Sequence, residues 1–90
     1  MKYVLLYTPA DDVAAKAPPH YEAHVARLMD FQGRGELLEV GVFGDPQGQG
    51  SMAIFASREG AEEFVREDPF LVNGVVESYE IRDWDVMPTP

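Results

Sequence analysis

The sequence has no cysteine and only seven basic residues among its 90. Without cysteine the chain can form no disulfide, has no thiolate nucleophile and offers no cysteine ligand to zinc. This absence leaves the redox compartment open, so a cytoplasmic location is the default expectation.

Positive charge is scarce relative to negative charge. Sixteen Asp and Glu against seven Lys and Arg give a formal net charge of −9. A surface with this balance repels phosphate backbones and anionic lipid headgroups. The basic residues also stand singly along the chain, with no basic stripe among them. We therefore expect neither nucleic acid nor a membrane as a partner.

Long hydrophobic runs are missing as well. The apolar run at residues 3–7 is too short for the core of a signal peptide, and no later stretch approaches the length that spans a bilayer. This pattern predicts no export signal and no transmembrane segment.

Histidine is rare, which limits metal binding. His20 and His24 are four residues apart and could share a metal on one helical face, but Glu22 is misplaced relative to the H-E-x-x-H pattern. A closed zinc site would need two carboxylates in addition. The glycine-rich segment 44–50 joins two predicted strands, so it lacks the helix N-terminus of a phosphate-binding loop. We expect no metal and no cofactor.

The overall composition of the chain is typical of a small globular domain. Hydrophobic residues make up 46% and charged residues 26% of the chain, well away from the composition of disordered proteins. Ninety residues supply one hydrophobic core. We therefore treat residues 1–90 as a single domain.

Hydrophobic periodicity and turn residues predict four strands and two helices. The predicted strands are residues 2–8, 36–43, 51–56 and 75–85. The first predicted helix covers residues 20–33 after Pro18 and Pro19. Arg27 lies on its predicted outer side, and its predicted apolar arc comprises Tyr21, His24, Val25, Leu28, Met29, Phe31 and Gln32. The second begins at the cap residue Ser57 and ends before Pro69.

The order βαββαβ predicts a ferredoxin-like α+β fold, with an antiparallel sheet and both helices on one of its faces. Strand 2–8 is apolar on both faces, which is typical of a central strand. The hairpin strands also carry apolar residues on both faces. We infer that a second copy of the chain covers the open face, giving a homodimer packed sheet to sheet.

Each predicted helix carries one titratable residue on its apolar face. His24 lies in the apolar arc of the first helix, while Asp68 completes an i, i+3, i+4, i+7 pattern with Ala61, Phe64 and Val65. Because both faces pack on the same sheet, the two side chains could meet and form a dyad for general acid or base chemistry. The plain structural alternative is a packed histidine and an aspartate that merely ends a helix.

The aromatic residues, Tyr7 among them, have spacings typical of a core. Phe70, directly beyond Asp68 and Pro69, could instead line the mouth of a pocket. We name Tyr7 and Phe70 as candidate residues of a substrate pocket.

Two motifs resemble the YciI-like (YCII-related) family, and the resemblance covers essentially the whole chain. Residues 23–28 (Ala-His-Val-Ala-Arg-Leu) are similar to the family's A-H-L-A-R-L segment. Residues 67–70 (Glu-Asp-Pro-Phe), followed by Gly74 and Val75, are similar to its D-P-[FY]…G-[VL] segment. The sequence departs from the family where Gly41-Val42-Phe43 stands in place of the usual G-P.

The resemblance implies a ferredoxin-like fold that dimerises into an α+β barrel, with catalytic His24 and Asp68. One branch of the family resembles a dehydrochlorinase of hydroxylated aromatic compounds, and the fold resembles muconolactone isomerases. We therefore expect a cofactor-independent acid/base enzyme of the lyase (dehydrochlorinase) or isomerase type, acting on a small molecule such as an aromatic compound. The alternatives are a non-catalytic, small-ligand-binding or accessory dimeric module, and a purely structural dimer without a cavity.

Overall fold

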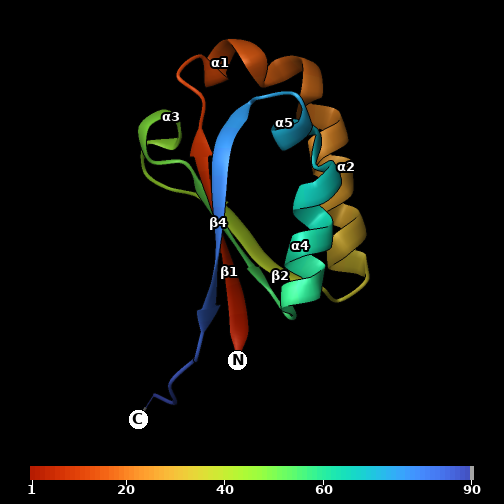
Figure 1. Cartoon of the computed structure of the whole chain (residues 1–90), viewed down its shortest axis with the longest axis vertical. Coiled ribbons are helices and arrows are strands. Elements are labelled where there is room, and N and C mark those ends of the chain that lie inside the picture. The colour runs from red at the N-terminus through yellow and green to blue at the C-terminus, as the bar shows by residue number, and fades with distance from the viewer. Residues whose placement is uncertain (90) are drawn as a thin grey trace.

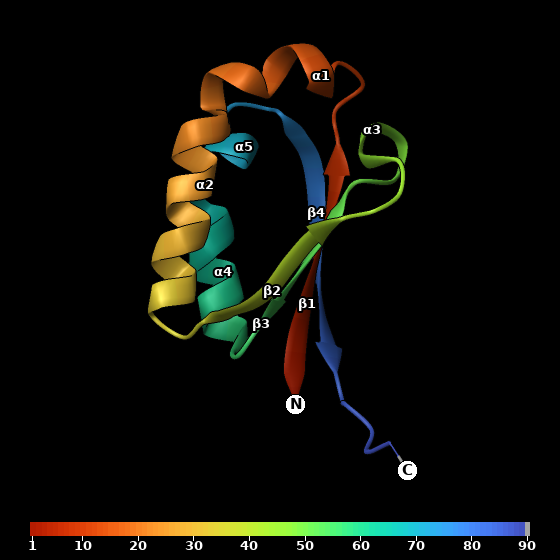
Figure 2. The ribbon, with the colours of Figure 1, turned by 180° about the vertical axis from the view of Figure 1, so that it is seen from behind.

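The computed structural model describes residues 1–89. Four antiparallel strands form one sheet in the order β2-β3-β1-β4. The strands are β1 (Lys2–Pro9), β2 (Leu37–Val42), β3 (Ser51–Phe55) and β4 (Val76–Trp84). Figures 1 and 2 show the two long helices side by side on one face of this sheet. The predicted ferredoxin-like α+β fold is confirmed.

The central position predicted for the first strand is also confirmed. β1 pairs with β3 on one side, with Tyr3 opposite Phe55, and with β4 on the other, with Tyr7 opposite Tyr79. The register places Tyr3, Leu5 and Tyr7 on the helix side of β1. Tyr7 therefore enters the space beneath the helices from the middle of the sheet.

The two long helices are α2 (Pro18–Gly33) and α4 (Arg58–Glu67). α2 begins with Pro18 and Pro19 inside its first turn, two residues earlier than predicted, because proline fits the start of a helix. α4 is capped as predicted, since the Ser57 hydroxyl accepts a hydrogen bond from the Gly60 amide.

Three helices of four residues were missed by the sequence prediction. They are α1 (Val13–Lys16), α3 (Pro46–Gln49) and α5 (Pro69–Val72). α3 lies in segment 44–50, so the connection between β2 and β3 contains a compact helical turn. Helices this short have little stability of their own, so they depend on the contacts around them.

The apolar arc predicted for α2 is partly wrong. Phe31 is fully buried, but Met29 is 65% exposed and Tyr21 is 60% exposed. Arg27, predicted on the outer side, instead packs against α4. Its guanidinium donates to the carbonyl oxygens of Glu63 and Phe64 and lies over the Phe31 ring. A long side chain with an apolar stem can occupy a helix interface when its charged head finds carbonyl partners.

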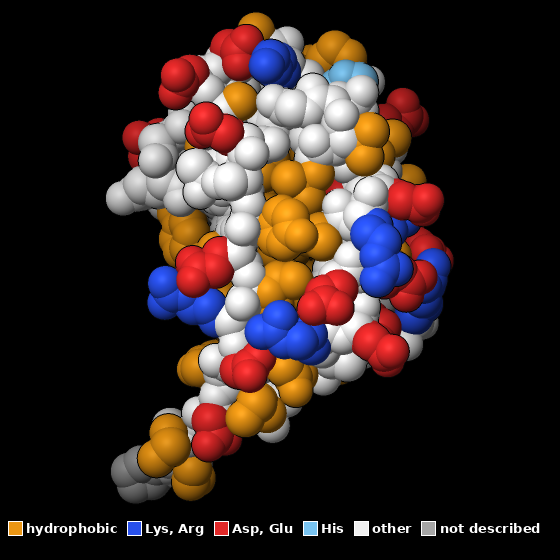
Figure 3. Space-filling model, in the orientation of Figure 1, with side chains coloured by type: hydrophobic (Ala, Val, Ile, Leu, Met, Phe, Trp, Pro, Cys, Tyr) orange, Lys and Arg blue, Asp and Glu red, His pale blue; other side chains and the backbone are white. Residues whose placement is uncertain are grey.

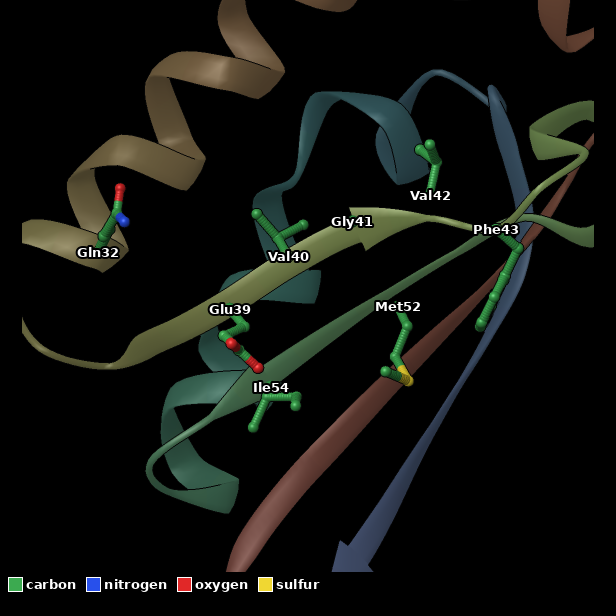
Figure 4. A pocket seen from close by; sticks show the side chains of 8 residues that line it. All are labelled: Gln32, Glu39, Val40, Gly41, Val42, Phe43, Met52 and Ile54. Atoms are coloured by element: carbon green, nitrogen blue, oxygen red, sulfur yellow. The ribbon is translucent and has the colours of Figure 1, made fainter.

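The face of the sheet opposite the helices is uncovered in the single chain. It carries a hollow of about 470 Å³ along β2 and β3. Figure 4 shows Met52 and Ile54 on this side of the sheet, while Val40 and Val42 lie on the helix side. A homodimer over this face remains a prediction.

Among residues 1–89, the structure contains no helix with the length and apolar character needed to cross a membrane.

Candidate active site

The site is built where the sheet, α2 and α5 meet. His24 comes from the middle of α2, Tyr7 from β1, and Asp68 from the junction between α4 and α5. His24 Nδ1 lies 2.6 Å from Asp68 Oδ1. The structure thus brings together the two residues that the sequence proposed as a dyad. Their catalytic role remains a prediction.

Asp68 does not lie on a helix face, and this part of the sequence interpretation is wrong. α4 ends at Glu67, and Asp68 has an extended backbone with φ −64° and ψ 121°. The cause is Pro69, whose ring disfavours helical geometry in the residue before it. Asp68 instead caps α5, because its Oδ1 accepts a hydrogen bond from the Phe70 amide at 3.2 Å.

Asp68 is fully buried and its carboxylate is fully engaged. Oδ1 contacts His24 Nδ1 and the Phe70 amide, while Oδ2 accepts a hydrogen bond from the Tyr7 hydroxyl. Its exposed fraction is 0%. A buried carboxylate is costly unless such partners are present. Three donors from three elements therefore fix its position and orientation.

The sequence predicts Tyr7 as a residue of the pocket but does not reveal its hydrogen bond to Asp68. Burial first, and then the negative charge of Asp68, raise the pKa of Tyr7 well above its usual range. The phenol therefore keeps its proton and donates a hydrogen bond to the carboxylate. The signal for this bond was a tyrosine on the buried face of a central strand, where its hydroxyl needs a polar partner.

Phe70 holds the imidazole of His24 from one side. The two rings are stacked, with centroids 3.8 Å apart and planes 4° from parallel. Phe64 approaches the imidazole edge-on, at 6.4 Å between centroids. With Nδ1 directed at Asp68, this packing restricts rotation of the ring.

A cleft of about 370 Å³ opens beside the imidazole. Its wall includes His24, Tyr7 and Phe70, together with residues of α1, β2 and α3. Asp68 is behind this wall, and the side chain of His24 is 13% exposed. The cleft argues against the purely structural interpretation, which predicted helix faces that close without a cavity.

The structure assigns no role to His20. It lies in the first turn of α2 and does not line the cleft. Within residues 1–89, no group of three or more His, Asp or Glu side chains is arranged to hold a metal ion.

The fold and these motifs define a small ferredoxin-like α+β domain with a buried carboxylate beneath a histidine. The chain belongs to the YCII-related domain family, whose model matches residues 1–85. A search of curated proteins finds no match.

A solved structure supports the fold. The chain is similar to 5-chloro-2-hydroxyhydroquinone dehydrochlorinase from Burkholderia phenoliruptrix AC1100, solved in complex with 2,5-dihydroxybenzoquinone. The identity is 20%, the match covers 94% of each chain, and the TM-score is 0.75. At this identity the likeness establishes a common fold.

Proposed function

We propose that the protein is a cofactor-independent acid/base enzyme of the lyase or isomerase type, with His24 as the group that transfers the proton. The observation that carries the proposal is the 2.6 Å contact between His24 Nδ1 and a fully buried Asp68, at the wall of a cleft. A general base needs both a fixed orientation and access to substrate, and this arrangement supplies both.

The roles of the two ring nitrogens follow from the hydrogen bonds of Asp68. A carboxylate offers only acceptors, so His24 Nδ1 is the donor in their contact. The neutral imidazole then carries its lone pair on Nε2. In the proposed reaction Nε2 takes a proton from the substrate, and Asp68 stabilises the imidazolium that forms.

The fate of that proton distinguishes the two reaction types. In an elimination, the electron pair of the broken bond to hydrogen forms a double bond and expels the leaving group. In an isomerisation, Nε2 returns the proton to a different atom of the same substrate. The dehydrochlorination performed by the structural neighbour makes elimination the first reaction to test.

The test is to screen halogenated and hydroxylated aromatic compounds for turnover and then compare variants. We expect His24→Ala to lose about 10²- to 10⁴-fold in kcat, more than Asp68→Asn. His20→Ala is the matched control, because His20 does not line the cleft, and should retain full activity. Equal turnover by wild type and a folded His24→Ala protein would remove His24 from the mechanism.

A further inference from the structure

Among residues 1–89, the wall of the cleft contains no Lys, Arg, Asp or Glu side chain. Apart from His24, this wall consists of aliphatic, aromatic, proline, glycine and serine residues. Ser51 and Tyr21 add hydroxyl groups, which can recognise a neutral polar substituent. The described wall therefore offers no Lys or Arg cation with which to pair an anionic ligand.

The arginines described by the structure do not line the cleft. Arg27 is bound to carbonyl oxygens of α4. Arg66 lines a separate groove between α4 and β4, where Figure 3 shows an apolar strip flanked by charged side chains. The other three, Arg34, Arg58 and Arg82, form ion pairs with acidic residues.

Neither lysine supplies the missing charge. Lys16 of α1 forms an ion pair with Asp12 at 3.4 Å. Lys2 is paired with Trp84 in the sheet register, at the opposite end of β1 from Tyr7 and Pro9, which line the cleft.

The cleft instead lies above negative charge. Asp68 is directly behind His24, and the whole chain has a net charge of −9. A ligand carboxylate in this apolar space would lose its hydration without gaining an opposite charge, which is costly. The volume of about 370 Å³ exceeds the ~150 Å³ of a cavity that holds benzene, so it has room for one substituted ring.

We propose that the cleft selects uncharged, single-ring hydroxylated compounds and rejects those that carry a carboxylate. This inference rests on the cleft being the substrate site of the proposed function, and it narrows the substrate class to neutral molecules. Apolar walls bind the ring, and the Ser51 and Tyr21 hydroxyls bind its polar substituents.

The experiment compares two ligands of nearly equal shape, 4-hydroxybenzamide and 4-hydroxybenzoate, which differ in charge at pH 7. Binding is measured from the backbone amide NMR shifts of cleft residues such as Val25 and Leu28. We expect the amide to bind at least ~10-fold more tightly than the carboxylate, because only the carboxylate brings an unpaired charge into the cleft.

A substitution in the cleft wall tests the cause. Val42 lies at the exposed edge of β2 and lines the cleft. We expect Val42→Lys to strengthen benzoate binding relative to benzamide binding about threefold or more at low salt. The neutral control Val42→Gln changes the same wall without adding charge, so it should leave the ratio of the two affinities as in wild type.

Three results would overturn the proposal: benzoate binding as tightly as the benzamide, neither ligand binding at millimolar concentration, or no gain from Val42→Lys. These results are independent of turnover. If the neutral ligand is preferred but no reaction is found, the selectivity stands and the enzymatic proposal fails. If a carboxylate is preferred and is turned over through His24, the enzymatic proposal stands and the proposed selectivity fails.

Discussion

At the scale of single residues, Asp68 is the centre of the hydrogen bonds at the candidate site. Its carboxylate receives hydrogen bonds from Tyr7, Phe70 and His24. The sequence pointed to His24 and Asp68 because they are titratable residues in apolar surroundings. The buried position of Tyr7 indicates that its hydroxyl needs a polar partner, but the sequence could not identify Asp68 as that partner, since the two residues are 61 positions apart.

The Tyr7 hydroxyl can be tested with Tyr7→Phe. Removing it leaves Asp68 Oδ2 buried without its donor, which should lower the free energy of unfolding at pH 7 by about 1–3 kcal/mol. Urea unfolding of both proteins measures this difference, and equal stability at pH 7 would contradict the assigned hydrogen bond.

The same pair predicts a pH dependence. The raised pKa means that folded Tyr7 keeps its proton when unfolded Tyr7 loses it, near pH ~10. The stabilisation is therefore complete below this pH and is lost as the pH rises above it. We expect the stability gap between wild type and Tyr7→Phe to narrow from pH 7 to pH 10.5. A stability difference that widens over this pH range would contradict a raised pKa of folded Tyr7.

At the scale of elements, the strands and long helices could be predicted because hydrophobic periodicity and turn residues specify them locally. The short helices α1, α3 and α5 could not, because four-residue helices are held by contacts from elsewhere in the chain. Helical periodicity alone also predicts a helical backbone at Asp68, but Pro69 disfavours helical geometry in the residue before it, so the backbone there is extended.

Gly50, between α3 and β3, links the cleft wall to β1. Its φ of +78° favours glycine, and a Cβ at this position would collide with the backbone carbonyl oxygen of Tyr7. With its ψ of −148°, this conformation is essentially restricted to glycine, and strain of this kind costs about 1–3 kcal/mol. We expect Gly50→Ala to lower the free energy of unfolding by more than this strain alone, and to perturb the NMR signals of Tyr7.

Gly35 is the matched control for this substitution. It has a similar φ of +77°, but an added Cβ would meet no atom within 4 Å. Gly35→Ala should therefore show the strain without the collision. Similar losses of stability in the two variants would contradict the close contact between Gly50 and β1.

At the scale of the whole molecule, the sheet is covered by helices on one face and open on the other. The open face has a second hollow, lined by Val4, Leu6, Met52 and Trp84 among others. Exposed apolar surface of this kind is typical of an interface. The central position of β1 could be predicted from the sequence, but the partner of the open face could not, because periodicity identifies an apolar face without identifying what covers it.

We predict a homodimer with the two open sheet faces in contact. Sedimentation at micromolar concentration should give twice the 10.0 kDa mass of the chain. Leu6→Glu should shift the protein toward monomer, because it places a charge in the interface. Val72→Glu, on exposed α5, should not. A stable wild-type monomer would rule out the dimer.

The proposed function requires that Asp68 orients His24 so that Nε2 is free to exchange a proton with a substrate. The most direct test is ¹⁵N NMR of the imidazole nitrogens, with His20→Gln used to assign the signals of the two histidines. We expect neutral His24 to carry its proton on Nδ1 and to have an unprotonated Nε2. A proton on Nε2, with Nδ1 unprotonated, would contradict it.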